Sequence, residues 1–315
     1  MNKITENNFV SITAADDLIV SNKQTNKFTN SIITARAFNQ FSQSANLIEN
    51  GKSVQHFMSN AAISSVWRES YVDLVATMPL TSNEPENTNM AESIIGIDDR
   101  KLISDTLLAP WCMICQLVIE CEDGVQSHGT GWFISPRTVM TAGHCVYEHR
   151  DNLGWVKSIE VIPGMNGHWK PFESVVGTFF QSVSGWTENQ FRSHDYGCIL
   201  LPKESALGEE TGWLGFASLS DDLLQNLLVN NGGYPADKTY GTLWFDTGRL
   251  INNSSKQLQY ELDTSGGQSG SPIWRLSGGQ RHVVGVHAYG GAENKSTRID
   301  KAVFKNMMNW KRLGF

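Results

Sequence analysis

Short hydrophobic runs alternate with turns rich in Gly, Pro, Asn and Asp along most of the chain after residue 93. Apolar runs of this length, bounded by turn residues, are typical of β-strands, and many such strands with few helices indicate a barrel or a sandwich. The last segment differs, because the apolar residues of 299–313 recur near helical spacing and predict an amphipathic helix that closes the domain. The predicted strands are 113–119, 131–134, 159–161, 198–201, 242–245, 257–262 and 282–286.

The first 92 residues have a different character. Residues 1–78 mix short helical patterns with polar stretches, and 46–58 and 61–76 are candidate amphipathic segments. Residues 79–92 contain two prolines among Asn, Ser, Thr and Glu and have almost no apolar content, which is typical of an exposed linker. We therefore expect an N-terminal segment over 1–78, a linker over 79–92 and an all-β domain over 93–315.

Charge and hydropathy exclude several classes of partner. The 315 residues carry a net charge of −7 with no basic cluster, so we expect no nucleic-acid partner. No stretch approaches the roughly 20 apolar residues that span a bilayer, so we expect no membrane partner. The apolar residues 18–20 follow two aspartates, which does not fit a conventional secretory signal. Secretion is nevertheless expected, either by another route or from a chain of which this sequence is a shortened form.

The five cysteines cannot all pair within one chain, so at least one is free or intermolecular. Cys112 and Cys115 have the spacing of half a zinc site, but a structural site needs a second ligand pair, and only Cys121 and His128 lie nearby. We therefore expect packed or disulfide-bonded strand cysteines, and no metal or other cofactor.

Three local patterns that carry chemistry occur in the order His, Asp, Ser. His144 follows two short strands and a small-residue turn, Asp195 stands at the start of an apolar strand, and Ser269 lies in the turn Gly-Gly-Gln-Ser-Gly-Ser-Pro. A serine hydroxyl becomes a good nucleophile when an imidazole removes its proton, and a carboxylate fixes the tautomer of that imidazole. The sequence therefore predicts a catalytic triad of these three residues. The glycines predict an oxyanion hole formed by the N–H groups of Gly267 and Ser269.

Each pattern also has an explanation without catalysis: a hydrogen-bonded core histidine, a strand-end acid and an ordinary glycine-rich hairpin turn. Their coincidence in this order favours a catalytic site. An α/β-hydrolase is excluded, because position 271 is Ser where the nucleophile elbow needs Gly, and because Ser269 follows both of its partners in the chain. The His-Glu-x-x-His motif of metallopeptidases and the phosphate-binding loop with Lys are both absent.

At these residues the sequence resembles the glutamyl endopeptidases, bacterial relatives of trypsin. The likeness covers most of 93–315 and rests on the motifs SIIGIDDR, TAGHC, GYPADK with GTLW, GGQSGSP, and TRI with VF. It implies two six-stranded antiparallel β-barrels with a C-terminal helix, preceded by a prosegment, and hydrolysis of protein or peptide substrates after acidic residues by a monomer. It also implies that the prosegment of a zymogen ends near Glu92, so that Ser93 begins the mature enzyme and contributes to the specificity pocket.

The resemblance leaves substrate choice open. His287 and Thr264 match the pocket histidine and hydroxyl of the family, and a buried glutamate carboxylate needs such partners. Asp263 lies six residues before Ser269, where trypsin has the acid that selects Lys and Arg, so cleavage after basic residues is the alternative. A non-enzymatic binding module on a protease scaffold is a third interpretation, although no triad residue is lost.

Two positions depart from the trypsin pattern. Trypsin has a cysteine fifteen residues before the catalytic His, and Gly129 stands there, so Cys145 has another partner or is free. Trypsin-like zymogens pair the new N-terminus with an acid just before the nucleophile, and Gln268 cannot form that ion pair. Activation is therefore expected to work differently.

Overall fold

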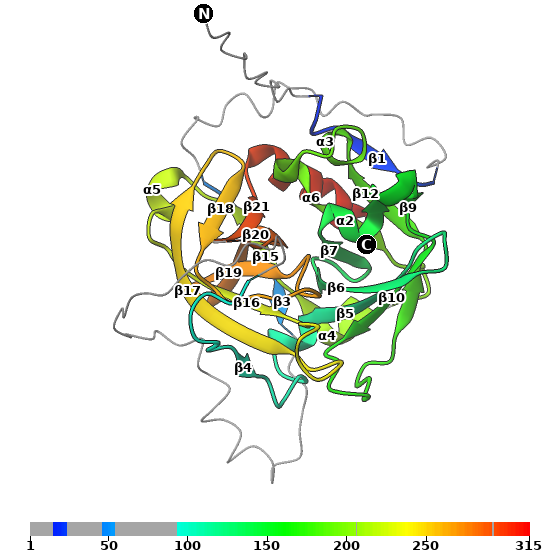
Figure 1. Cartoon of the computed structure of the whole chain (residues 1–315), viewed down its shortest axis with the longest axis horizontal. Coiled ribbons are helices and arrows are strands. Elements are labelled where there is room, and N and C mark those ends of the chain that lie inside the picture. Colours follow the sequence, from blue (N-terminus) through cyan, green and yellow to red (C-terminus); the bar gives the residue numbers. More distant parts are fainter. Residues whose placement is uncertain (1–14, 24–45, 54–92, 206, 292) are drawn as a thin grey trace, which may run out of the picture.

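The structure, a computed structural model, describes residues 15–23, 46–53 and 93–315 except 206 and 292. Two β-barrels lie side by side, and a long C-terminal helix packs along them (Figure 1). Each of the seven strands predicted from the hydrophobic runs overlaps an observed strand, so the all-β prediction is confirmed. The linker 79–92, Glu92 and the candidate segment 61–76 lie outside the described residues.

The first barrel closes through a bend in one stretch of chain. Its sheet has the order β12-β13-β7-β6-β5-β10-β11 with antiparallel neighbours, and β11 and β12 are separated only by Thr178. The two ends of the sheet are therefore one bent strand, which gives six strands around the ring. The bounds are β5 Ile114–Glu120, β6 Gln126–Phe133, β7 Thr138–Thr141, β10 Ser158–Pro163, β11 Val175–Gly177, β12 Phe179–Val183 and β13 Gly197–Leu200.

The second barrel closes by direct pairing. Its order is β19-β16-β17-β18-β21-β20, and an additional antiparallel pairing of β19 with β20 joins the two ends. The prediction of two six-stranded antiparallel barrels is therefore confirmed. The bounds are β16 Leu228–Gly233, β17 Trp244–Asn253, β18 Gln257–Tyr260, β19 Pro272–Ser277, β20 Gln280–Tyr289 and β21 Asn294–Arg298.

The predicted C-terminal helix is α6, Lys301–Leu313. Asp300 caps it, because its Oδ1 accepts the N–H groups of Ala302 and Val303 at 2.9 Å each. The apolar face includes Trp310, which is fully buried in the main core. The remaining elements of residues 93–315 are β4 Lys101–Leu102, β8 Tyr147–Glu148, β9 Gly154–Trp155, β14 Gly212–Trp213, β15 Gly215–Ser218, α2 Gly143–Val146, α3 Ser184–Thr187, α4 Leu207–Thr211, α5 Asp221–Leu224, η1 Trp111–Met113, η2 Arg150–Asn152 and η3 Arg192–His194.

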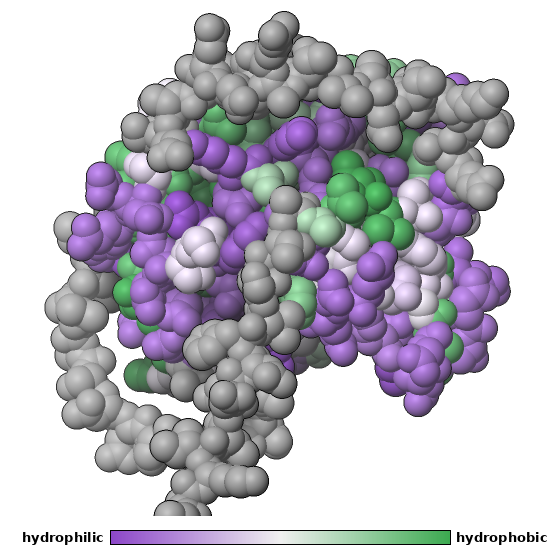
Figure 2. Space-filling view, turned by 90° about the horizontal axis from the view of Figure 1, so that it is seen from above, coloured by the Kyte–Doolittle hydropathy of each residue, from purple (hydrophilic) through white to green (hydrophobic). Residues whose placement is uncertain are grey.

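Apolar side chains gather inside and polar ones outside. The largest buried side chains are Trp132, Trp274 and Trp310, one each from the two barrels and the helix. Figure 2 shows that the visible described surface is mostly hydrophilic, with hydrophobic residues in small groups. Among the described residues, no helix is long and apolar enough to cross a membrane.

Two pieces of the N-terminal segment add short strands to the edges of the sheets. Strand β1 (Ile19–Ser21) pairs with β12, while β2 (Leu47–Glu49) and β3 (Lys52–Ser53) pair with β15 and β14. The described part of the candidate segment 46–58 is thus extended, not helical. Its local periodicity is overridden because an open sheet edge offers backbone partners to an extended chain.

Candidate active site

The structure brings His144 and Asp195 together. His144 lies in α2, directly after β7, and Asp195 follows η3 at the entrance to β13. His144 Nδ1 lies 2.8 Å from Asp195 Oδ2, and the His144 backbone N–H donates to Oδ1 at 2.9 Å. Gly143 permits this approach, since a Cβ there would lie 2.9 Å from Asp195 Oδ1. The carboxylate therefore holds both the ring and the backbone of the histidine.

The environment sets the charge of this pair. The Asp195 side chain is fully buried, whereas 31% of the His144 side chain is exposed. Burial lowers the pKa of His144, but the Asp195 carboxylate and the neighbouring Cys145 together raise it by more, and the net pKa lies well above the ordinary value. The ring of Tyr289 is centred 6.3 Å from that of His144, and the pKa of Tyr289 is raised by burial and by Asp195. The imidazolium is thus stabilised.

Ser269 comes from the other barrel, and its turn is held against the first. The Ser269 carbonyl accepts the Thr130 N–H at 2.9 Å and the Cys145 thiol at 3.7 Å. Gly270 has φ +88°, and a Cβ there would lie 2.2 Å from Thr141 Oγ1. The backbone of Ser269 therefore lies beside the residue that follows His144. Proton transfer from the Ser269 hydroxyl to the His144 ring stays a prediction.

Gly267, which the sequence predicts to be part of the oxyanion hole, has a backbone conformation that favours glycine. Its φ is +95°, and a Cβ would lie 2.5 Å from the Tyr234 carbonyl, so no other residue fits without movement. Its carbonyl accepts the Thr130 hydroxyl at 2.8 Å. Its N–H donates to no acceptor among the described residues and is therefore available to a ligand.

Ser93 and Thr264 are neighbours. The Thr264 N–H donates to the Ser93 carbonyl at 3.2 Å, and Asn294 binds both the N–H and the carbonyl of Ser93 at 3.1 and 2.8 Å. The Thr264 hydroxyl is buried and has no hydrogen-bond partner among the described residues. A buried hydroxyl of this kind has unused capacity to bind a polar ligand.

His287 is fully buried on β20 and joins the serine turn through its backbone. Its carbonyl accepts the Gly270 N–H at 2.7 Å, and its N–H donates to the Ser271 carbonyl at 2.9 Å. Its Nδ1 lies 2.6 Å from the Tyr260 hydroxyl. The structure thus fixes the ring of His287 one strand away from the predicted nucleophile.

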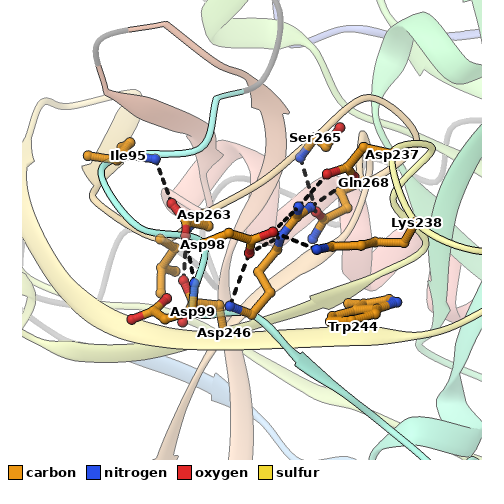
Figure 3. A network of polar contacts seen from close by, with 12 residues as sticks. Ile95, Asp98, Asp99, Asp237, Lys238, Trp244, Asp246, Asp263, Ser265 and Gln268 are labelled. Carbon is orange, nitrogen blue, oxygen red and sulfur yellow. Dashed lines mark hydrogen bonds and ion pairs between the residues drawn. The ribbon is translucent and has the colours of Figure 1, made fainter. Parts of the chain in front are cut away.

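The carboxylate of Asp263 accepts hydrogen bonds from backbone N–H groups. Its two carboxylate oxygens accept the N–H groups of Ile95 at 2.6 Å and Asp99 at 3.2 Å, as Figure 3 shows. Burial raises the pKa of Asp263, and burial also raises that of the adjacent Asp246 to about 7. Oxygens of Asp99, Asp246 and Asp263 lie within 4.8 Å of one another. This carboxylate anchors the segment that begins at Ser93.

All five cysteines lie within the described residues and are buried free thiols, so the disulfide alternative is wrong and the packed alternative holds. The Cys112 thiol donates to the Thr211 carbonyl at 3.2 Å, and burial raises its pKa to about 12. The Cys112 thiol therefore stays protonated. The Cys145 thiol donates to the Ser269 carbonyl, whereas the corresponding cysteine of trypsin forms a disulfide.

Sequence reasoning missed a buried arginine beside the serine turn. The Arg100 side chain is fully buried and donates to Gln268 Oε1 at 3.1 Å. It also missed a surface pocket next to the His144–Asp195 pair, lined in part by Tyr289, Arg192, Glu293 and Lys295. The only local signal for the buried arginine was the charged run Asp-Asp-Arg after Ser93, and this run does not indicate which residue the arginine contacts.

Known proteins share these features. Residues 112–310 match the trypsin family model. The chain is 37% identical over 229 residues to the glutamyl endopeptidase of Bacillus licheniformis, covering 70% of this chain and 69% of that protein. It is 38% identical over 226 residues to a Bacillus subtilis protein named extracellular metalloprotease, covering 71% of each. A solved structure of a Glu endopeptidase in complex with MPD aligns with a TM-score of 0.62 at 26% identity, over 70% of this chain and 99% of that one.

The chain belongs to the trypsin family, with the double barrel and the serine turn of that class. It is a serine endopeptidase and acts on protein or peptide substrates. Within the family it is a relative of the glutamyl endopeptidases, which the resemblance predicted.

Proposed function

We propose that this endopeptidase cleaves after glutamate, with Ser269 as nucleophile, His144 as general base and Asp195 as the carboxylate that orients the base. The observation that carries the proposal is the 2.8 Å contact of His144 Nδ1 with a fully buried Asp195. This contact directs Nε2 of the ring away from Asp195, which is the orientation that a base for Ser269 requires.

In the proposed mechanism, Ser269 Oγ attacks the scissile carbonyl as His144 takes its proton. The developing oxyanion is bound by the N–H groups of Gly267 and Ser269, and the positive φ of Gly267 supports this role. His144 then protonates the leaving amine, and water hydrolyses the acyl-enzyme with His144 again as base. Asp195 stabilises the imidazolium at both charged stages, which agrees with the raised pKa of His144.

The preference for glutamate is supported by the surroundings of the serine turn. The unpartnered Thr264 hydroxyl and the buried His287 offer hydrogen-bond partners to a carboxylate, and Ser93 lies next to Thr264. The name of the Bacillus licheniformis relative agrees with this choice. Selection of Lys or Arg by Asp263 is disfavoured, because backbone N–H groups already occupy that carboxylate.

Processing after Glu92 follows from the same specificity, because the bond before Ser93 is itself a bond after glutamate. The proposal therefore divides the chain into a prosegment over 1–78, a linker over 79–92 and a protease domain over 93–315. We further propose a secreted monomer that binds neither nucleic acid nor membrane.

The test compares the full-length protein with its Ser269→Ala variant on a denatured protein, with every new terminus identified by mass spectrometry. Cuts after Glu that depend on Ser269, including the cut after Glu92, support the proposal. Cuts after Lys or Arg would transfer specificity to Asp263. Absence of Ser269-dependent cuts after the linker has been opened by an added protease would leave the binding-module interpretation.

A further inference from the structure

Arg100 is a buried cation with every donor used. Nε and Nη2 donate to the two oxygens of Asp98 at 2.9 Å each. Nη1 donates to Asp237 Oδ1 and to Gln268 Oε1 at 3.1 Å each, and Nη2 also donates to Asp237 Oδ2. A guanidinium has five N–H groups in a planar fork, and all five are engaged. Asp98 and Asp237 are its counter-ions, Lys238 is a second cation on Asp98, and one N–H of Nη1 is left for Gln268.

Gln268 is the residue just before Ser269 and the centre of the serine turn. Its Oε1 also accepts the Ser265 N–H at 3.0 Å, and its Nε2 donates to Asn231 Oδ1 at 3.0 Å. Its backbone N–H and carbonyl bond to Ser265 and Ser271 at 3.0 and 2.9 Å. Figure 3 shows Asp98, Asp237 and Gln268 converging on one point. The amide of Gln268 therefore has one orientation, fixed at the oxygen end by Arg100.

We propose that Arg100 is a positioning residue for catalysis, which holds Gln268 and through it keeps the N–H groups of Gly267 and Ser269 aimed at the oxyanion. This inference rests on the proposed function, because it assigns those N–H groups to transition-state binding. Arg100 reaches Gln268 across 168 residues of sequence, from the segment that Ser93 begins. That segment is anchored separately by the bonds of Asp263 to Ile95 and Asp99.

The arrangement explains why Gln268 can replace the acid of trypsin. In trypsin-like zymogens a new terminal amine supplies the positive charge that pairs with that acid. Here the charge comes from an interior side chain, and its counter-ions are Asp98 and Asp237. Gln268 then only needs to accept a hydrogen bond. The serine turn is therefore ordered by a side chain of the 93–102 segment and not by its terminus.

The test uses Arg100→Met and Arg100→Lys with Lys238→Met as the matched control. Lys238 is the second cation on Asp98, and it makes no contact with Gln268 among the described residues. Active sites are titrated, and kcat and KM are measured on a glutamate-containing peptide. Loss of one oxyanion donor costs about 10²–10³ in kcat. We expect about 10–100-fold lower kcat per titrated site for Arg100→Met, with KM within about threefold.

Arg100→Lys should recover part of that loss, because an ammonium can still reach one acceptor, and Lys238→Met should stay close to wild type. A second arm repeats Arg100→Met in a Gln268→Met background. If Arg100 acts through Gln268, it has little further effect on kcat there, whereas independent effects would multiply. Asp237→Asn serves if Arg100→Met does not fold, since Asp237 is half-exposed and its loss should lower kcat several-fold.

The outcomes separate this inference from the proposed function. A wild type without Ser269-dependent cleavage after glutamate refutes both. If the wild type is active but Arg100→Met keeps its kcat per titrated site, the role of Arg100 is overturned and the proposed function stands. The same holds if the effects of Arg100→Met and Gln268→Met on kcat multiply. Lower thermal stability with unchanged kcat would assign Arg100 to folding alone.

Discussion

Replacing Asp195 by Asn tests the His144–Asp195 pair directly. The carboxylate accepts two hydrogen bonds, from the ring N–H and from the backbone N–H of His144, at 2.8 and 2.9 Å. An amide of the same shape has only one oxygen. Its NH₂ group must therefore face one of the two donors, or the ring must change its tautomer and present an acceptor instead.

Two magnitudes follow. In trypsin the equivalent substitution leaves the imidazole in the wrong tautomer and lowers kcat by about 10⁴, and we expect a loss of that order here. The acid limb of the pH profile should also move. The Asp195 carboxylate raises the pKa of His144 and burial lowers it, so removal of the carboxylate should lower the pKa of His144. Activity requires neutral His144, so the wild-type limb lies above about pH 6.5, and the variant limb lies below that of the wild type.

The assay is kcat/KM on a glutamate-containing peptide between pH 5 and 9, with active sites titrated at each pH. Asp195→Glu, which keeps the charge, is the control and should keep the limb in place while lowering the plateau. A plateau loss below tenfold, or a limb that does not move in Asp195→Asn, would refute the assignment of Asp195 as the orienting carboxylate.

Stability gives a second readout of the same pair. The pKa of His144 is raised on folding, so its charged form stabilises the protein fully below about pH 6.5, and this contribution is lost as the pH rises through the folded pKa. Asp195→Asn should therefore lower the free energy of unfolding more at pH 6 than at pH 9. An equal loss at both values would mean that the carboxylate does not stabilise the imidazolium.

Three further predictions concern packing, substrate and processing. Gly270→Ala should destabilise the fold by more than about 2 kcal/mol in thermal unfolding, since its Cβ would meet Thr141 Oγ1 at 2.2 Å, whereas Gly278→Ala, with open space around it, should cost less. Thr264→Val should raise KM for glutamate substrates about tenfold while fluorophosphonate labelling is retained, and an unchanged KM would remove Thr264 from the pocket. After cleavage of the linker, the N-terminal fragment should co-elute with the rest in size-exclusion chromatography, because Glu49 binds buried Lys311 at 2.6 Å; separate elution contradicts this.

The sequence predicted those parts of the molecule that depend on neighbours in the chain. The apolar run of β5 and the helical spacing of α6 are local patterns, and so are the contexts of His144 and Ser269. Their pairing could be inferred because the three motifs occur together in the order that a resembling family uses. The resemblance to that family also implied the two six-stranded barrels that the structure has.

The parts that sequence reasoning missed depend on distant partners. Arg100 and Gln268 are 168 residues apart, and nothing near either residue indicates the other. The paired residues of β2 and β15 lie 167 to 171 positions apart in the sequence, and β2 is only three residues long, too short for a periodic signal. Asp263 had the right position for a specificity acid, but its bonds to Ile95 and Asp99 could only be found in three dimensions.

Because the site is divided between the two barrels, its geometry depends on how the barrels are held against each other. His144 and Asp195 belong to the first barrel, and Ser269 enters from the second. The connection between the barrels carries β14 and β15. Strands β2 and β3 pair with them, and α6 packs on β15 and places Lys311 over the ring of Trp213 in β14. A displacement of about 1 Å between reacting groups can cost about a hundredfold in rate. Residues 46–53 and α6, although remote from the chemistry, thus brace the connection between the barrels and help to hold His144 and Ser269 at a fixed separation.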